Sequence, residues 1–255
     1  MNKLCINVFC GFEFEELCRM AKEIGFDGIF SDESDAVNTD KILQNRIIAD
    51  RYSLYYETSH SKIKGCEDIW SDTYTAAEYE KELKLCIDNC AVNHIGILVV
   101  HIQTGNNKVN IDCGMKSLQN IINYAGRKNV EIAFENINNS SLLYYVMDNF
   151  RSPSVGFCYD SGHELCHTPG ENFLDRLGDR LICTHLHDND GSADQHCMMY
   201  TKAVNFSRIA SQLKELKYTG GLSLELAYSG TGIKKREFLS RAYEGLKKFY
   251  SEIAG

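Results

Sequence analysis

Acidic and imidazole side chains recur along this sequence at the ends of short apolar runs. His60 and His101 end two of these runs, Glu135 and Asp160 end the next two, and Glu225 ends the last. Carboxylates and imidazoles are the groups that most often transfer protons in enzymes and that bind divalent metal ions. Their repeated position predicts a single site that is assembled from several segments of the chain.

A seventh run carries its polar residues as His185-Leu-His187-Asp188, and His163 follows shortly after Asp160. Such a cluster without Lys or Arg beside it would repel itself, and the pKa values of its carboxyl groups would rise. A divalent cation would keep the carboxylates ionised. The mixture of two Glu, one Asp and His suits Mn, Mg, Co or Zn, so we expect a divalent metal at this site.

The apolar runs alternate with amphipathic stretches from one end of the chain to the other. Strands are predicted over residues 4–9, 26–30, 53–58, 95–102, 130–137, 155–159, 181–186 and 222–226. Helices are predicted over residues 14–24, 40–49, 76–90, 109–127, 141–150, 173–177, 206–216 and 234–253. Regular alternation of strand and helix indicates a parallel sheet with helices packed on it.

Eight such units within 255 residues predict a (β/α)8 TIM barrel of α/β class, with residues 1–255 forming one domain. A doubly wound open sheet is the alternative. It would normally show a glycine-rich phosphate turn after the first strand, and Cys10-Gly11-Phe12 is not such a turn. In a barrel, functional residues stand at the carboxyl ends of the strands, which is where the polar residues fall.

Strand alternation places small residues beneath the polar ones, because residues two apart share a face. These inward pairs are Ala133 with Glu135, Cys158 with Asp160, Cys183 with His185 and His187, and Ser223 with Glu225. We therefore expect a polar pocket above a tightly packed floor.

Composition excludes several classes of protein. A net charge of −8 argues against a general affinity for nucleic acid. The 11 cysteines are odd in number and several lie in apolar runs, which favours free thiols in a reducing compartment. No leader-like segment opens the sequence and no run of 18 apolar residues occurs, so we expect a cytoplasmic protein that does not span a membrane. A monomer and a homo-oligomer are both compatible with the sequence.

Taken together, seven motifs resemble the xylose isomerase-like superfamily of TIM barrels. They are Gly25-Phe-Asp-Gly28-Ile, Val100-His101, Phe134-Glu135-Asn136, Asp160-Ser-Gly-His163, His185-Leu-His-Asp-Asn189-Asp-Gly191, Asp194-Gln-His196 and Leu224-Glu225. The superfamily includes metal-dependent isomerases and epimerases of sugars and sugar phosphates. It also includes apurinic endonucleases of the endonuclease IV type.

The resemblance implies a set of metal ligands. By analogy with the isomerases these are Glu135, Asp160, His185 and Glu225, with His187 as the alternative to His185. Positions used by the endonuclease branch are also present and imply further metal or substrate ligands: His60, His101, His163, Asp194 and His196. His187 is a further candidate for metal or substrate binding.

The resemblance favours isomerisation or epimerisation of a sugar or sugar phosphate in carbohydrate metabolism. It would proceed through an enediolate, with the metal-bound Glu135 and Glu225 as the acid–base pair. The alternative is a zinc-dependent apurinic endonuclease, a phosphodiesterase. Two observations count against DNA: the net charge is −8, and residues 61–65 after His60 carry no aromatic side chain to fill a vacated base position. A separate departure is that residues 197–203 replace the Pro/Gly-rich turn that usually follows His196, which affects the substrate side of this loop. The expected partner is therefore a small sugar.

Overall fold

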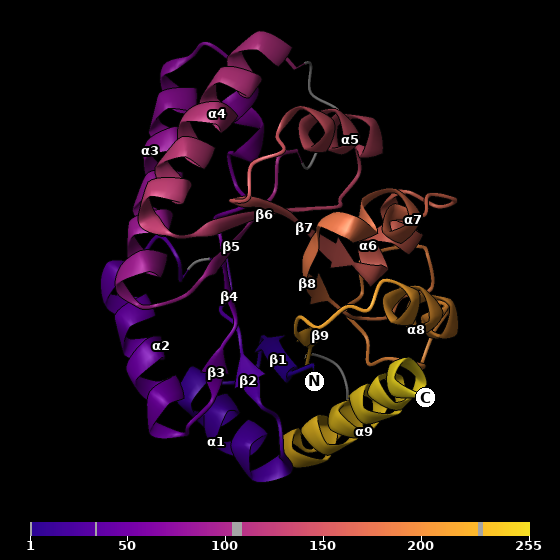
Figure 1. Ribbon diagram of the computed structural model, residues 1–255. Coiled ribbons are helices and arrows are strands. Elements are labelled where there is room, and N and C mark those ends of the chain that lie inside the picture. Colours follow the sequence, from indigo (N-terminus) through magenta and orange to yellow (C-terminus); the bar gives the residue numbers. More distant parts are fainter. Residues whose placement is uncertain (1, 34, 104–108, 229–231) are drawn as a thin grey trace.

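The fold is a barrel of parallel strands surrounded by helices (Figure 1). The computed structural model describes residues 2–33, 35–103, 109–228 and 232–255. The strands are β1 Leu4–Phe9, β2 Gly28–Ile29, β3 Tyr55–Tyr56, β4 Thr58–His60, β5 Ile97–Val100, β6 Glu131–Glu135, β7 Val155–Asp160, β8 Leu181–His185 and β9 Leu222–Ala227. The strands are short and mostly buried, as expected for a sheet that helices cover.

Hydrogen bonds close the strands into a ring. The pairing order β3-β2-β1-β9 forms one arc, and β4-β5-β6-β7-β8 forms the other. The arcs meet at Glu57, which separates β3 from β4, and at a bridge between Leu186 and Leu224 that joins β8 to β9. The prediction of a (β/α)8 barrel is confirmed.

The helices form the outer ring (Figure 1). They are α1 Phe14–Ile24, α2 Thr39–Arg51, α3 Tyr74–Val92, α4 Ile111–Lys128, α5 Ser140–Asn149, α6 Ser161–His167, α7 Phe173–Leu177, α8 Phe206–Glu215 and α9 Lys235–Ala254, with 3-10 turns at Cys66–Trp70 and Gly178–Arg180. An asparagine side chain accepts a hydrogen bond from the first turn of five of them: Asn38, Asn110, Asn139, Asn172 and Asn205. These caps fix where each helix leaves the rim of the barrel. No helix among the described residues is long and apolar enough to cross a membrane.

Three local predictions needed correction. The third predicted strand is interrupted at Glu57, where the chain changes its partner from β2 to β5. Residues 161–167 form α6 instead of a loop, because Asp160 caps them by accepting a hydrogen bond from the His163 amide at 2.6 Å. The helix predicted over residues 141–150 is α5 Ser140–Asn149 and begins one residue earlier, because Asn139 caps it.

Small residues fill the barrel interior beneath the polar mouth, as the alternation pattern predicted. Val99, Ala133, Cys158 and Cys183 form a buried apolar cluster of their own, separate from the larger core between strands and helices. Because these side chains are small, the polar residues two positions further along each strand sit low in the barrel and close to one another.

One carboxyl group is buried in this interior. Glu57 accepts a hydrogen bond from Ser223, and its Oε1 atom has no hydrogen-bond partner. A Cβ atom on Gly221 would lie 1.7 Å from Oε1, so any other residue there would displace the Glu57 carboxyl group. Burial raises the pKa of Glu57, although hydrogen bonding to Ser223 and the charge of His185 oppose the shift.

The raised pKa predicts how the substitution Glu57→Gln changes stability with pH. The folded protein holds this proton more tightly than the unfolded chain, whose glutamate pKa is about 4.3. Stability from this group is therefore lost as pH rises above that value, and Gln cannot lose a proton. We therefore expect the difference in Tm, variant minus wild type, to increase as the pH is raised from about 4 to about 8. Glu215→Gln, at an exposed glutamate of α8, is the control, and parallel curves for both variants would contradict the prediction.

Candidate metal centre and active site

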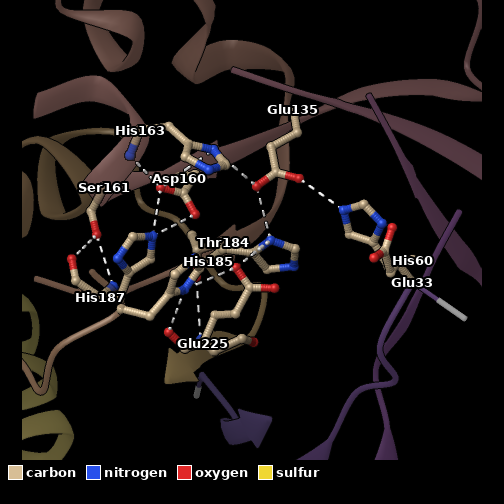
Figure 2. Close-up of polar contacts among 12 residues, drawn as sticks. Glu33, His60, Glu135, Asp160, Ser161, His163, Thr184, His185, His187 and Glu225 are labelled. Carbon is tan, nitrogen blue, oxygen red and sulfur yellow. Dashed lines mark hydrogen bonds and ion pairs between the residues drawn. The ribbon is translucent and has the colours of Figure 1, made fainter. Parts of the chain in front are cut away.

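Glu135, at the end of β6, is the centre of the polar cluster. Its Oε2 atom lies 3.2 Å from Nε2 of His60 and 2.8 Å from Nε2 of His101. Its Oε1 atom lies 3.0 Å from Nδ1 of His185 and 3.6 Å from Nδ1 of His163. Figure 2 shows Glu135 with His60 on one side and with His163 and His185 on the other. The two oxygens of one buried carboxylate thus face different sets of imidazoles.

Asp160, at the end of β7, organises a second group. Nε2 of His187 lies 3.1 Å from both carboxylate oxygens of Asp160. The same carboxylate lies 3.7 Å from Nδ1 of His163 on the helix that Asp160 caps. One aspartate therefore fixes the start of α6 and faces two imidazoles.

The loop after β8 brings two further residues to the mouth. Nε2 of His196 lies 2.9 Å from Oδ2 of Asp194, and Nε2 of His163 lies 3.2 Å from the same atom. Glu225 on β9 completes the ring, with its Oε2 atom 3.7 Å from Nδ1 of His185 and 3.7 Å from Nδ1 of His196. The ten residues predicted from the sequence therefore gather at the carboxyl end of the barrel.

A buried aspartate holds this loop in place. The Asp188 carboxylate accepts backbone hydrogen bonds from Thr201, Lys202 and Val204 at 2.9, 2.7 and 2.9 Å. The backbone of Asp188 also pairs with Cys197. These contacts fold the segment that carries Asp194 and His196 back across the barrel.

The direction of the imidazole rings fits a bound cation. His60, His163 and His196 each direct Nδ1 at a backbone carbonyl, at 2.6, 3.0 and 3.1 Å, and a carbonyl can only accept. Nδ1 must therefore carry the hydrogen, and in a neutral ring Nε2 presents its lone pair. Each of these Nε2 atoms faces a carboxylate oxygen, which is repulsive unless a proton or a metal ion lies between them.

Several groups of three residues have ligand atoms that lie within 4.8 Å of one another. They include His60, His101 and Glu135; Glu135, Cys158 and His185; Asp160, His163 and His187; and His187, His196 and Glu225. His163, His167 and Asp194 form another, so His167 also belongs to the cluster, although it is not among the residues predicted from the sequence. Its spacing of four residues from His163 on one helix was the available signal.

Charge balance agrees with this geometry. Burial alone raises the pKa of Glu135, but the charges of His185 and His101 hold it well below its ordinary value. Burial lowers the pKa of His163, yet Asp160 and Asp194 raise it to about 10. The carboxylates of the site thus favour positive charge on His163, whereas at His101 burial outweighs Glu135 and lowers the pKa.

The cluster borders a cavity of about 200 Å³. Seven of the ten predicted residues line it, while Asp160, His185 and His187 lie beneath and are at most 1% exposed. The other lining residues, which the sequence did not reveal, are Phe9, Asp32, Glu33 and Ile63. None of the described lining residues is Lys or Arg.

All ten predicted residues are thus brought together, but not as one shell. Glu135, His185 and Glu225 lie around one centre, because both glutamates approach Nδ1 of His185. Asp160 lies closer to His163 and His187. Convergence of Glu135, Asp160, His185 and Glu225 on a single metal ion remains a prediction.

The substitution Gly162→Ala is expected to damage this site without touching a charged residue. A Cβ atom at Gly162 would lie 1.9 Å from Cε1 of His187, so the ring must leave Asp160. We expect weaker metal binding, by about 10- to 100-fold, as for other residues that orient ligands. Isothermal titration with Mn²⁺ measures this. Gly96→Ala is the control, because nothing lies within 4 Å of its added Cβ; equal affinities for both variants would contradict the prediction.

The sequence matches the family model of the xylose isomerase-like TIM barrel over residues 18–248, and the chain belongs to this family. Curated relatives include Uncharacterized protein y4fM of Sinorhizobium fredii, 31% identical over 50% of this chain and 43% of that protein. Another is Uncharacterized protein MJ1311 of Methanocaldococcus jannaschii, 29% identical over 52% of this chain and 50% of that protein. The matches span about half the length of these relatives.

Solved structures share the whole fold. A D-tagatose 3-epimerase-like protein superposes with a TM-score of 0.81 at 19% identity, over 99% of this chain and 98% of that one. D-psicose 3-epimerase of Clostridium cellulolyticum H10, solved with D-tagatose, gives 0.80 at 11% identity over 98% and 99% of the two chains. D-allulose 3-epimerase of Methylomonas sp., solved with D-allulose, gives 0.79 at 14% identity over 98% of both.

Proposed function

We propose that this protein is a divalent-metal-dependent isomerase or epimerase of a sugar or sugar derivative. The observation that carries the proposal is that two glutamates from different strands, Glu135 on β6 and Glu225 on β9, converge on Nδ1 of His185, at 3.0 and 3.7 Å. Whole-chain similarity to sugar 3-epimerases supports it.

Glu135, Asp160, His185 and Glu225 would hold the metal in this proposal. A divalent cation, when bound, would polarise a carbonyl oxygen and its neighbouring hydroxyl oxygen. One glutamate takes the proton from the carbon beside the carbonyl, and the other returns a proton. Return from the opposite face inverts the carbon, which is epimerisation. His101 and His163, which line the cavity, would orient hydroxyl groups, while the buried His187 would hold Asp160 in place.

Solvent isotope exchange tests this chemistry. The Mn²⁺-loaded protein is incubated in deuterated water with free ketohexoses and aldohexoses, and the recovered sugars are analysed by NMR and mass spectrometry. We expect deuterium at the reacting carbon of the product. Turnover of a sugar without deuterium at any conversion would overturn the two-carboxylate mechanism and indicate a hydride shift between adjacent carbons.

A second function, metal-dependent hydrolysis of a phosphodiester, is favoured by one observation. Oε2 of Glu135 faces His60 and His101, while Oε1 faces His185 and His163. A carboxylate with imidazoles on both oxygens suits a bridge between two metal ions, and such pairs stabilise attacking and leaving oxygens. A one-metal isomerase does not need His60 or His101 as ligands.

Cleavage of a duplex with one abasic site distinguishes the two functions. The Zn²⁺-loaded protein is assayed on this duplex and on an intact duplex, and the metal content of the same sample is measured. Cleavage at the abasic site with more than one metal per chain would favour the phosphodiesterase. We expect no cleavage, because the charge of −8 opposes binding to DNA.

A further inference from the structure

A second cavity adjoins the metal-binding one along β1. It also has a volume of about 200 Å³, and it shares two lining residues, Phe9 and Asp32, with the first. We call it the β1 cavity and define it by Asn7, Phe9, Cys10, Phe12, Glu13 and Asp32. Each cavity alone is smaller than the roughly 300–1,000 Å³ of common ligand sites, but together they reach that range.

Asn7 is an unpartnered polar group in this cavity. Leu4, Ile6 and Val8 pack into the outer core, so alternation directs Asn7 into the barrel, where it pairs in register with Glu225. It is 5% exposed, lines the β1 cavity, and its side chain makes no hydrogen bond with any described residue. Because this amide opens into the cavity, a hydroxyl group of a ligand can hydrogen-bond to it.

The remaining walls combine ring faces with acceptors. Phe9 and Phe12 are only partly buried, and Phe9 packs edge-on against His196 at 4.6 Å, which places it between the two cavities. Glu13 and Asp32 supply carboxylate oxygens, and Lys41 at the rim is the only cation among the described lining residues. Aromatic faces beside carboxylates and an amide suit the C–H faces and hydroxyl groups of an uncharged sugar ring. The surplus of carboxylates opposes an anionic group such as phosphate.

We propose that the β1 cavity binds a second sugar ring, so that the substrate is a disaccharide or glycoside whose reacting ring occupies the metal-binding cavity. This inference rests on the proposed function. It narrows the substrate class from any sugar to one that carries an uncharged glycosyl group.

Cys10 provides a readout of binding that does not depend on turnover. Its side chain is exposed and lines the β1 cavity. The rate of maleimide labelling at Cys10 is measured by peptide mass mapping on the Mn²⁺-loaded protein, with Cys10→Ser as the blank. The probes are two disaccharides with a reducing fructose unit, isomaltulose and lactulose, and free D-fructose at equal concentration.

We expect a disaccharide to slow the labelling of Cys10 and D-fructose to leave it unchanged. Asn7→Ala should weaken protection by about tenfold, the cost of one lost hydrogen bond. Asn149→Ala, at an exposed asparagine on α5, should not.

The outcomes separate this inference from the proposed function. Deuterium incorporation into sugars with no protection of Cys10 by either disaccharide would overturn the second-ring site and leave the epimerase intact. Equal protection by fructose and by the disaccharides would also overturn it. Protection by a disaccharide that depends on Asn7, without any isotope exchange, would support the site and count against epimerase chemistry.

Discussion

The substitution Glu135→Gln is expected to lower turnover by about 100- to 10,000-fold, the usual contribution of a positioned acid–base group, and to weaken metal binding in addition. The amide keeps the shape of the side chain but cannot accept a proton from carbon. It also replaces one of the two oxygens by an NH2 group. Oε2 now faces His101 and His60 at 2.8 and 3.2 Å, and Oε1 faces His185 at 3.0 Å, so at either position the NH2 group would face an imidazole nitrogen. The decrease is measured as kcat for whichever sugar the isotope screen identifies.

Two companion variants make the result specific. Glu225→Gln should also lower kcat, but because Glu225 faces fewer imidazoles it should keep more of the metal affinity. Glu82→Gln, at a partly exposed ion pair with Lys62, should change neither quantity. An epimerase predicts a difference between the two glutamine variants. A variant that retains one working carboxylate can still exchange the substrate hydrogen with solvent, although it forms no product. Wild-type kcat in both Glu135→Gln and Glu225→Gln would remove these residues from the mechanism.

The barrel could be predicted from the sequence because its strands and its helices have different hydrophobic patterns. Runs such as residues 95–102 are apolar throughout, and the helical stretches between them are amphipathic, so strands and helices are distinguished. The same alternation predicted the small residues of the floor, Ala133, Cys158 and Cys183, which form one buried cluster. The prediction of an uninterrupted third strand was wrong. The strand is interrupted at Glu57 because the chain changes its pairing partner there to close the barrel, and no local sequence pattern encodes this change.

The ten polar residues could be predicted because functional residues of a barrel stand at the carboxyl ends of its strands, and the apolar runs show where each strand ends. The same argument could not predict Phe9, Asp32, Glu33 or Asn7. Asp32 and Glu33 lie in a loop whose path is set by contacts such as the hydrogen bond from the Ile63 amide to Glu33 at 3.0 Å. Asn7 sits inside a strand that is otherwise apolar, and its orientation follows from the register with β9. Walls made by loops depend on tertiary contacts between distant segments.

Removal of divalent metal is expected to lower the Tm of the protein by roughly 10 °C. A ligand present at about 1,000 times its Kd stabilises a fold by about 4 kcal/mol, and each kcal/mol shifts Tm by about 2–4 °C in a chain of this size. The source of the effect is electrostatic: the carboxylates of Glu135, Asp194 and Glu225 line one cavity, Asp160 lies beneath it, and its described lining includes no Lys or Arg. Without a cation, protonated imidazoles must supply the positive charge.

The measurement is a thermal melt of chelator-treated protein with and without added Mn²⁺, Co²⁺, Mg²⁺ or Zn²⁺, together with metal analysis by mass spectrometry. Asp160→Asn is the informative variant. Its Tm without metal will be lower because Asp160 also caps α6, so the quantity to compare is the rise in Tm on adding metal. That rise should shrink in Asp160→Asn and persist in Asp190→Asn, an exposed aspartate of the same loop system. An identical Tm with and without metal in the wild type would contradict a metal centre at this mouth.

The number of ions bound per chain distinguishes the two functions. If one ion per chain gives the whole rise in Tm, the result fits the isomerase. If Tm continues to rise as further ions bind, His60, His101 and Asp194 are required as ligands, and phosphodiester hydrolysis is favoured.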